Sequence, residues 1–142
     1  MRRRAGRLSL FVLFAIVGGS GSVRGQESTT TAAQSAVDAW LSLVDGGSYA
    51  ESWDAAATPF RHAITREKWE GAVRTVREPL GQLKSRRIRS TKSTTSLPGV
   101  PDGEYVVFQF DTTLAHKAAA VETVTAVREK DGTWYVGGYF IK

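Results

Sequence analysis

Residues 104–141 read EYVVFQFDTTLAHKAAAVETVTAVREKDGTWYVGGYFI, and this stretch decides the fold of the 142-residue chain. Aromatic and β-branched residues alternate in it with polar ones, which is typical of strands with one buried face. Asp131-Gly132 predicts a two-residue hairpin turn between strands at 119–129 and 133–141. Residues 104–114 form the strand before these two, and a further strand at 83–95 precedes the whole stretch, so the sequence predicts a four-stranded antiparallel sheet.

The part of the chain before the strands has helical periodicity. Apolar residues at helical spacing mark a first helix that ends at Gly46-Gly47; they are Val37, Trp40, Leu41 and Val44. A capping box at 48–51 opens a second helix that ends at Pro59, and Thr65 caps a third that ends near Pro79. Three helices followed by four strands predict a single α+β domain over residues 35–142, with the helices packed on one face of a curved sheet.

The first 25 residues have the pattern of an export signal. Four arginines at positions 2–7 precede an apolar run at 8–17, and small residues follow up to Gly25, where we expect cleavage. An apolar run of this length cannot cross a bilayer as a helix, which takes about 20 residues. The Ser/Thr-rich segment 26–34 is expected to be a flexible tether. The sequence therefore predicts a periplasmic or secreted protein with no membrane span after signal removal.

The positive charge of the chain is concentrated in this signal. The whole chain has 19 basic and 14 acidic side chains, a net charge of +5, and five of its arginines precede Gln26. The predicted mature protein is therefore neutral, which removes the main support for a nucleic-acid partner. There is no cysteine, and His62 and His116 are the only histidines, so we expect no disulfide, no metal site and no cofactor.

The turn before strand 119–129 decides which side chains face the helices. A turn of two or four residues at His116-Lys117 places Phe110 beside Thr123 and Phe108 beside Thr125. Glu122 and Val124 then lie on the opposite face of the sheet. A three-residue turn at Ala115–Lys117 would instead move Glu122 to the helix side.

Two candidate binding surfaces follow from the first of these registers. Between helices and sheet, aromatic residues and threonines could line an apolar ligand cavity, and the ordinary alternative is a plain aromatic core. The cavity residues are Trp53, Trp69, Phe108, Phe110, Thr112 and Thr125. The outer face carries more apolar area than a solvated sheet needs, which predicts a protein interface or a homodimer through the sheet; the alternative is a sheet partly covered by its own first strand and tail. The interface residues are Tyr105, Val124, Tyr135 and Tyr139.

Charged residues offer two further hypotheses. The strand at 83–95 is basic, and it could hold an anion or form a cross-strand charge ladder with Asp111 and Glu122, which is the simpler expectation. Its basic residues are Lys84, Arg86, Arg87, Arg89 and Lys92. His62 could act as a general base only with a carboxylate to orient it. An exposed or backbone-bonded histidine is the simpler expectation there too.

Several short motifs occur in an order that resembles a known family. They include Arg77-Glu78-Pro79-Leu80-Gly81, Ser96-Leu97-Pro98-Gly99, Pro101-Asp102-Gly103-Glu104-Tyr105 and Gly138-Tyr139-Phe140-Ile141. Over residues 33–142 the chain resembles the bacterial exported family catalogued as domain of unknown function 4019. That resemblance implies no activity and no site residue.

The order of helices and strands is also similar to the cystatin-like cone of the nuclear transport factor two superfamily. That superfamily includes dehydratases, isomerases and non-catalytic binding modules, so the resemblance leaves the activity open. We expect a non-catalytic exported module that binds a small apolar ligand or a protein partner. The alternative is a small cofactor-independent lyase or isomerase that uses His62 with a carboxylate.

Overall fold

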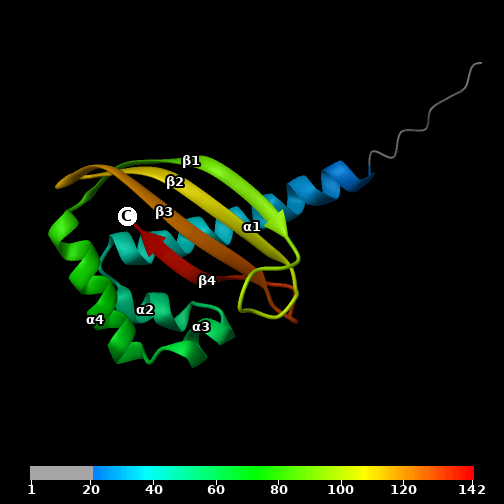
Figure 1. Ribbon diagram of the computed structural model, residues 1–142, viewed down its shortest axis with the longest axis horizontal. Helices are drawn as coiled ribbons and strands as arrows, with labels where there is room; N and C mark the ends of the chain where they lie inside the picture. The colour runs from blue at the N-terminus through cyan, green and yellow to red at the C-terminus, as the bar shows by residue number, and fades with distance from the viewer. Residues whose placement is uncertain (1–20) are drawn as a thin grey trace, which may run out of the picture.

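The computed structural model describes residues 21–142, so the expected export signal lies outside the described residues apart from its end. The elements, drawn in Figure 1, are α1 (Gly21–Asp45), α2 (Tyr49–Asp54), α3 (Thr58–Ala63), α4 (Arg66–Arg77), a 3₁₀ turn η1 (Glu78–Leu80), β1 (Leu83–Thr94), β2 (Tyr105–Leu114), β3 (Lys117–Arg128) and β4 (Trp134–Ile141). The strands form one antiparallel sheet in the order β1-β2-β3-β4. The α+β class and the antiparallel meander are as predicted, and four α-helices stand in the described range where three were expected.

Helix α1 begins earlier than its apolar pattern indicates. It starts at Gly21 and includes the segment 26–34 that the sequence predicts as a tether. Among the α1 side chains that the structure describes, burial begins at Ala33 and continues at Val37 and Trp40. Extending an existing helix costs far less than starting one, so a polar stretch can continue a helix anchored further along the chain.

The second predicted helix is divided into α2 and α3. Ala56 forms a parallel bridge with Val136 of β4, and the Ala57 N–H donates to the Val136 carbonyl at 2.8 Å. At the start of α3, the Glu129 carboxylate accepts hydrogen bonds from the Thr58 N–H at 2.5 Å and the Thr58 hydroxyl at 3.1 Å. The partners that split the helix lie more than 70 residues away, so local periodicity could not reveal the break.

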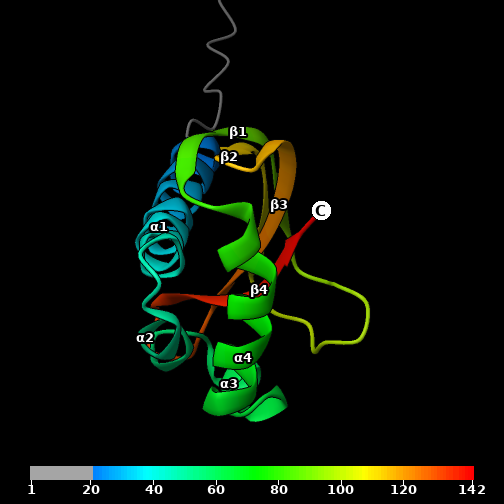
Figure 2. The ribbon, with the colours of Figure 1, turned by 90° about the vertical axis from the view of Figure 1, so that its left-hand side faces the viewer.

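The helices and the sheet form two layers. Figure 2 shows α1 at the left and the loop after β1 projecting at the right. Apolar side chains of α1, α2 and α4 pack against the inner face of the sheet, where Phe108, Val124 and Val136 are fully buried. The outer face carries half-exposed side chains such as Val107 and Thr123. No helix within residues 21–142 has the length and apolar character that crossing a lipid bilayer requires.

The register between β2 and β3 differs from the one expected for a two-residue turn. Ala115 and His116 form the turn, one residue earlier than expected, and a bulge after Thr112 adds a residue to β3; together these changes leave the pairing one position away from the expected register. Phe108 therefore pairs with Val124 and Phe110 with Glu122, not with Thr125 and Thr123. The placement of Glu122 and Val124 on the outer face was wrong, because a one-residue slip exchanges the two faces of a strand. Both side chains have 0% exposure on the helix side.

A second irregularity, between β3 and β4, exchanges the faces at the end of β4. The shift lies beside Gly137 and Gly138, and a side chain at Gly137 would come within 3.2 Å of Val127. Tyr139, expected on the outer face, packs against the core as a result, whereas Phe140 is 60% exposed. Asp131-Gly132 lies in the β3–β4 turn as predicted. However, the Glu129 N–H donates to the Thr133 carbonyl, so this turn has three residues, 130–132.

Candidate functional site

A buried ionic cluster lies where the ends of α1 and α4 meet the inner face of the sheet. We define the cluster by its members, which are Asp45, Arg77, Arg86, Thr112, Glu122 and Tyr139. They come from α1, α4 and all four strands, and the largest sequence distance between hydrogen-bonded members is 62 residues. Local sequence patterns do not bring these six residues together.

Arg86 links the two carboxylates of the cluster. Its Nη1 and Nη2 donate to both oxygens of Asp45, at 2.7 and 2.9 Å, and its Nε donates to Oε1 of Glu122 at 2.8 Å. All three guanidinium nitrogens of Arg86 are thus engaged. The planar fork of arginine suits this bidentate arrangement, and a lysine could not reproduce it.

Glu122 has no exposed surface and is surrounded by donors. Oε1 also accepts from the Thr112 hydroxyl, and Oε2 accepts from the Tyr139 hydroxyl, each at 2.6 Å. Arg77, only 4% exposed, donates through Nη2 to Asp45 at 2.9 Å and through Nη1 to Tyr139 at 3.3 Å. Among the described residues, its Nε has no hydrogen-bond partner.

The electrostatics of the cluster favour the charged forms of Asp45 and Arg86 and the neutral form of Tyr139. Burial by itself would raise the pKa of Asp45, but hydrogen bonds from Arg86 and Arg77 outweigh it and lower that pKa. Burial would lower the pKa of Arg86, yet its bonds to Asp45 and Glu122 raise it. For Tyr139, burial and then the charge of Glu122 raise the pKa of the phenol. Every oxygen of the two carboxylates accepts a hydrogen bond within the cluster, so the arrangement ties elements together and presents no free base.

The predicted cavity residues are distributed over three environments. Trp69, Phe108 and Phe110 are buried in the core, where Trp69 lies 4.9 Å from Phe60 and 5.9 Å from Trp40 between ring centres. The Trp53 indole donates to the Ile64 carbonyl at 2.8 Å. Thr112 belongs to the ionic cluster, and Thr125 lies on the outer face. The structure brings only the aromatic members together, and they pack against one another as in an ordinary core.

Two buried polar contacts in this core carried no sequence signal. Trp40 donates to the Ser52 carbonyl at 2.8 Å, and Trp69 donates to the Ser52 hydroxyl at 2.9 Å. Ser52 is fully buried between the two indoles. A serine in a short helix gives no pattern that would single it out, and its partners lie 12 and 17 residues away.

Two of the four predicted interface residues lie in the interior and two lie on the outer face of the sheet. Val124 and Tyr139 lie inside, so they cannot belong to an outer surface. Tyr105 and Tyr135 remain on the outer face, where each pairs with Val127 and the three form a half-exposed row across β2, β3 and β4.

An open groove, which we call the α3 groove, lies beside this row. It has a volume of about 880 Å³ and is enclosed by α3, the loop before β2 and the β3–β4 turn. Its apolar walls are formed by Pro59, Ala63, Pro101, Tyr105 and Val127. The Tyr105 hydroxyl donates to the Pro101 carbonyl at 2.5 Å, which fixes one wall to the loop.

His62 lines the α3 groove together with three carboxylates. The Glu129 carboxylate accepts hydrogen bonds from Thr58 at the start of α3. Asp131 accepts from the Thr133 N–H and the Tyr135 hydroxyl, at 2.9 and 2.8 Å. In the described part of the chain, the His62 imidazole makes no hydrogen bond or ion pair. Nor do any three His, Asp or Glu side chains of residues 21–142 lie together as a metal site.

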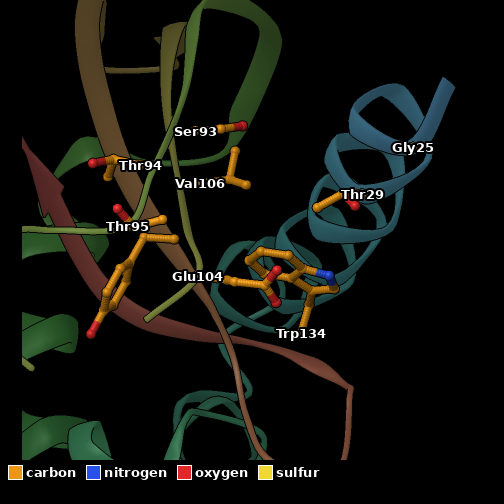
Figure 3. A pocket seen from close by; sticks show the side chains of 9 residues that line it. Gly25, Thr29, Ser93, Thr94, Thr95, Glu104, Val106 and Trp134 are labelled. Atoms are coloured by element: carbon orange, nitrogen blue, oxygen red, sulfur yellow. The ribbon is translucent and has the colours of Figure 1, made fainter. Parts of the chain in front are cut away.

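A smaller cavity of about 260 Å³ lies between α1 and the ends of β1 and β2. Figure 3 shows Trp134 and Glu104 facing Thr29 of α1 across it. Gly25, where cleavage is expected, forms part of its wall. Processing at that position would therefore open this cavity on one side.

These features define a small α+β protein with a one-sided antiparallel sheet, an interior closed by an ionic cluster and a groove at one end of the sheet. The chain belongs to the family described as "Protein of unknown function (DUF4019)", whose model matches residues 36–139. No curated protein matches the chain. It is similar to a solved structure from Catenulispora acidiphila, with 17% identity and a TM-score of 0.55, over 84% of this chain and 94% of that one. At this identity the likeness shows the fold alone.

Proposed function

We propose that this protein is a non-catalytic binding module of the cell envelope, and that the α3 groove receives an apolar group carried by a small ligand or by a partner protein. The apolar walls of an open groove carry this proposal, because exposed apolar concavities of this kind are where ligands and partners commonly bind. The export pattern of residues 1–25 supports the location outside the cytoplasm.

The interior is filled by side chains, which favours a binding site on the surface. Aromatic side chains fill the space between helices and sheet, and the polar groups at its end are bonded mainly to one another. A ligand entering there would have to displace Trp69 or Phe108, both buried against other rings or apolar residues. In the α3 groove, by contrast, Ala63 and Pro59 are already exposed.

The alternative is a small lyase- or isomerase-like enzyme that uses His62. Its support is that His62 and Asp102 line the same groove. A general base needs an orienting partner within hydrogen-bond reach, and Glu129 and Asp131 are bonded elsewhere. We therefore favour a binding role over a catalytic role.

The substitution Ala63→Glu tests the groove directly. A carboxylate at this exposed position puts a charge against the apolar walls without disturbing the core. Protein purified from the envelope is analysed by native mass spectrometry for bound small molecules and, after cross-linking, for protein partners. Wild type should carry a bound species that Ala63→Glu lacks.

The matched control is Ala32→Glu, at an exposed position of α1. It should retain the species. If Ala63→Glu keeps it as well, the groove is not the binding surface. If the wild type converts a bound small molecule into a product and His62→Ala does not, the enzyme alternative is favoured.

A further inference from the structure

The basic strand β1 contains two irregular positions, and both carry a cation. The pairing with β2 shifts between Leu83 and Ser85 and again between Ile88 and Ser90, so Lys84 and Arg89 are the extra residues. Bulges of this kind redirect side chains and occur often beside functional sites. Here the second bulge brings Arg89 to the side of Asp111, the residue that pairs with Arg87.

The observed register removes half of the charge ladder that would neutralise this strand. That ladder needed both Asp111 and Glu122 on the outer face, and Glu122 is buried in the ionic cluster. Asp111 is then the one carboxylate that β2 and β3 place on this face within Tyr105–Val127. Arg87, Arg89 and Lys92 lie along the same face, so cations outnumber carboxylates there.

Arg87 and Arg89 border an open groove of about 700 Å³, which we call the arginine groove. Ser85 and Thr113 also line it, and Arg86, fixed by Asp45 and Glu122, forms its inner side. Arg89 approaches Asp111 only to 3.8 Å, with both side chains about half exposed, so this pair is weak. Within the described residues, the Arg87 guanidinium makes no hydrogen bond or ion pair.

We propose that the arginine groove binds an oxyanion of the phosphate class, held between the Arg87 and Arg89 guanidinium groups with the Ser85 hydroxyl as a further donor. Each planar guanidinium group can donate two parallel N–H bonds to the oxygens of a phosphate, so two guanidinium groups in one groove suit such an anion. Because the predicted mature chain is neutral overall, the attraction is local to this groove and does not depend on a general positive field. The site lies apart from the α3 groove and does not rest on the function proposed for it.

Titration of the ¹⁵N-labelled mature protein with inorganic phosphate at low salt tests the site. Backbone shifts should move at β1 and the β2–β3 bulge, with saturation below about 10 mM. Arg87→Gln and Arg89→Gln should each weaken binding about tenfold, since each loses a charge-assisted contact. Both side chains are exposed, so folding should be unaffected.

Arg61→Gln is the matched control, because Arg61 is an exposed arginine on α3, away from the groove. It should bind phosphate as the wild type does, whereas Asp111→Asn, which removes the competing carboxylate, should bind more tightly. Equal weakening in Arg61→Gln and Arg87→Gln would overturn the proposal, because it would show a general charge effect. Absence of any shift at β1 would also overturn it.

Vesicles distinguish the source of the phosphate. Phosphatidylglycerol in phosphatidylcholine is compared with phosphatidylcholine alone by co-sedimentation. Binding to the anionic vesicles that Arg87→Gln abolishes identifies a lipid headgroup as the ligand. Phosphate binding in solution without vesicle binding supports a soluble phosphate ligand.

Discussion

Glu122 is a carboxylate without exposed surface, and it is stable there because its oxygens meet hydroxyl and guanidinium donors. Thr112, Tyr139 and Arg86 all donate to it. Removing one partner of such a group leaves the others buried and uncompensated, which costs more than the pair contributes. The cluster therefore makes the packing of α1 and α4 on the sheet sensitive to single substitutions.

We expect Glu122→Ala to lower the free energy of unfolding by about 3–5 kcal/mol, because Arg86 Nε and the Tyr139 hydroxyl lose their acceptor. Urea denaturation followed by tryptophan fluorescence measures the change. Glu70→Ala on α4, which removes a carboxylate with no hydrogen bond or ion pair among the described residues, should stay within about 0.5 kcal/mol of wild type. Equal, small losses in both variants would contradict a structural role for the cluster.

Tyr139 makes stability depend on alkaline pH. Burial and the neighbouring Glu122 charge raise the pKa of Tyr139 in the folded state above the value of about 10 that it has when unfolded. Above pH 10 the unfolded chain therefore releases a proton that the folded chain retains, so stability is fully present below about pH 10 and falls as the pH rises.

Tyr139→Phe removes this dependence, and it also removes the donor to Glu122. At neutral pH we expect a loss of about 1–2 kcal/mol. Between about pH 10 and 11 the wild type should lose roughly 1 kcal/mol more than the variant does. Urea midpoints over this range, with Tyr105→Phe as the outer-face control, measure the difference; parallel curves for wild type and Tyr139→Phe would show that Tyr139 titrates normally.

At the scale of elements, the tip of the β2–β3 hairpin is held against the corner between η1 and β1. The Ala115 N–H donates to the Gln82 carbonyl at 2.8 Å, and the His116 N–H donates to the Leu80 carbonyl at 2.9 Å. Gly81, at the corner, has a φ of 76° and a ψ of −168°, a conformation that is essentially restricted to glycine. The His116 ring closes over this glycine.

Gly81→Ala should destabilise the protein by about 2 kcal/mol or more. The new Cβ would lie 2.8 Å from the His116 ring and 2.9 Å from the Ala115 Cβ, and the backbone conformation disfavours any side chain. Gly71→Ala is the matched control, because Gly71 is exposed within α4 with open space around it, and alanine should stabilise the helix by about 0.5–1 kcal/mol. Thermal unfolding of the two variants should thus shift in opposite directions, and a shared direction would contradict this account of the corner.

At the scale of the whole molecule, the α+β class, the element order and the aromatic core followed from local patterns. Periodicity, turn residues and caps such as Thr65 are encoded within a few positions of the structure they produce, although Ser48 of the predicted capping box makes no side-chain cap bond. The bulges beside Thr112 and Gly137 are not, since they depend on how one strand meets another. These bulges determine which faces Glu122 and Tyr139 occupy. The ionic cluster forms only because both side chains lie on the inner face.

One member of the ionic cluster did leave a signal. Trp69, Val73 and Arg77 are spaced by four residues and are the buried residues of α4. An arginine on the apolar stripe of a helix needs a buried partner. That spacing predicts a carboxylate nearby, although the position of Asp45, 32 residues earlier, could not be read from it.

Export and folding should be separable in this chain. We expect cleavage after Gly25 to shorten α1 by its first residues without loosening the core, because burial among the described α1 side chains begins at Ala33. It also removes five arginines and leaves a neutral protein. Expression of the full chain in a bacterial host should therefore yield a periplasmic or secreted form that begins near Gln26 and focuses far below the precursor pI of 9.8.

The control for export is Leu13→Arg, which interrupts the apolar run of the predicted signal. This variant should remain uncleaved in the cytoplasm, and its folded domain should unfold at nearly the same temperature as the processed wild type. Cell fractionation, intact mass and thermal denaturation measure the three quantities. Export of Leu13→Arg at the wild-type level would refute the signal, and a large loss of thermal stability on processing would show that residues before Gln26 contribute to the core.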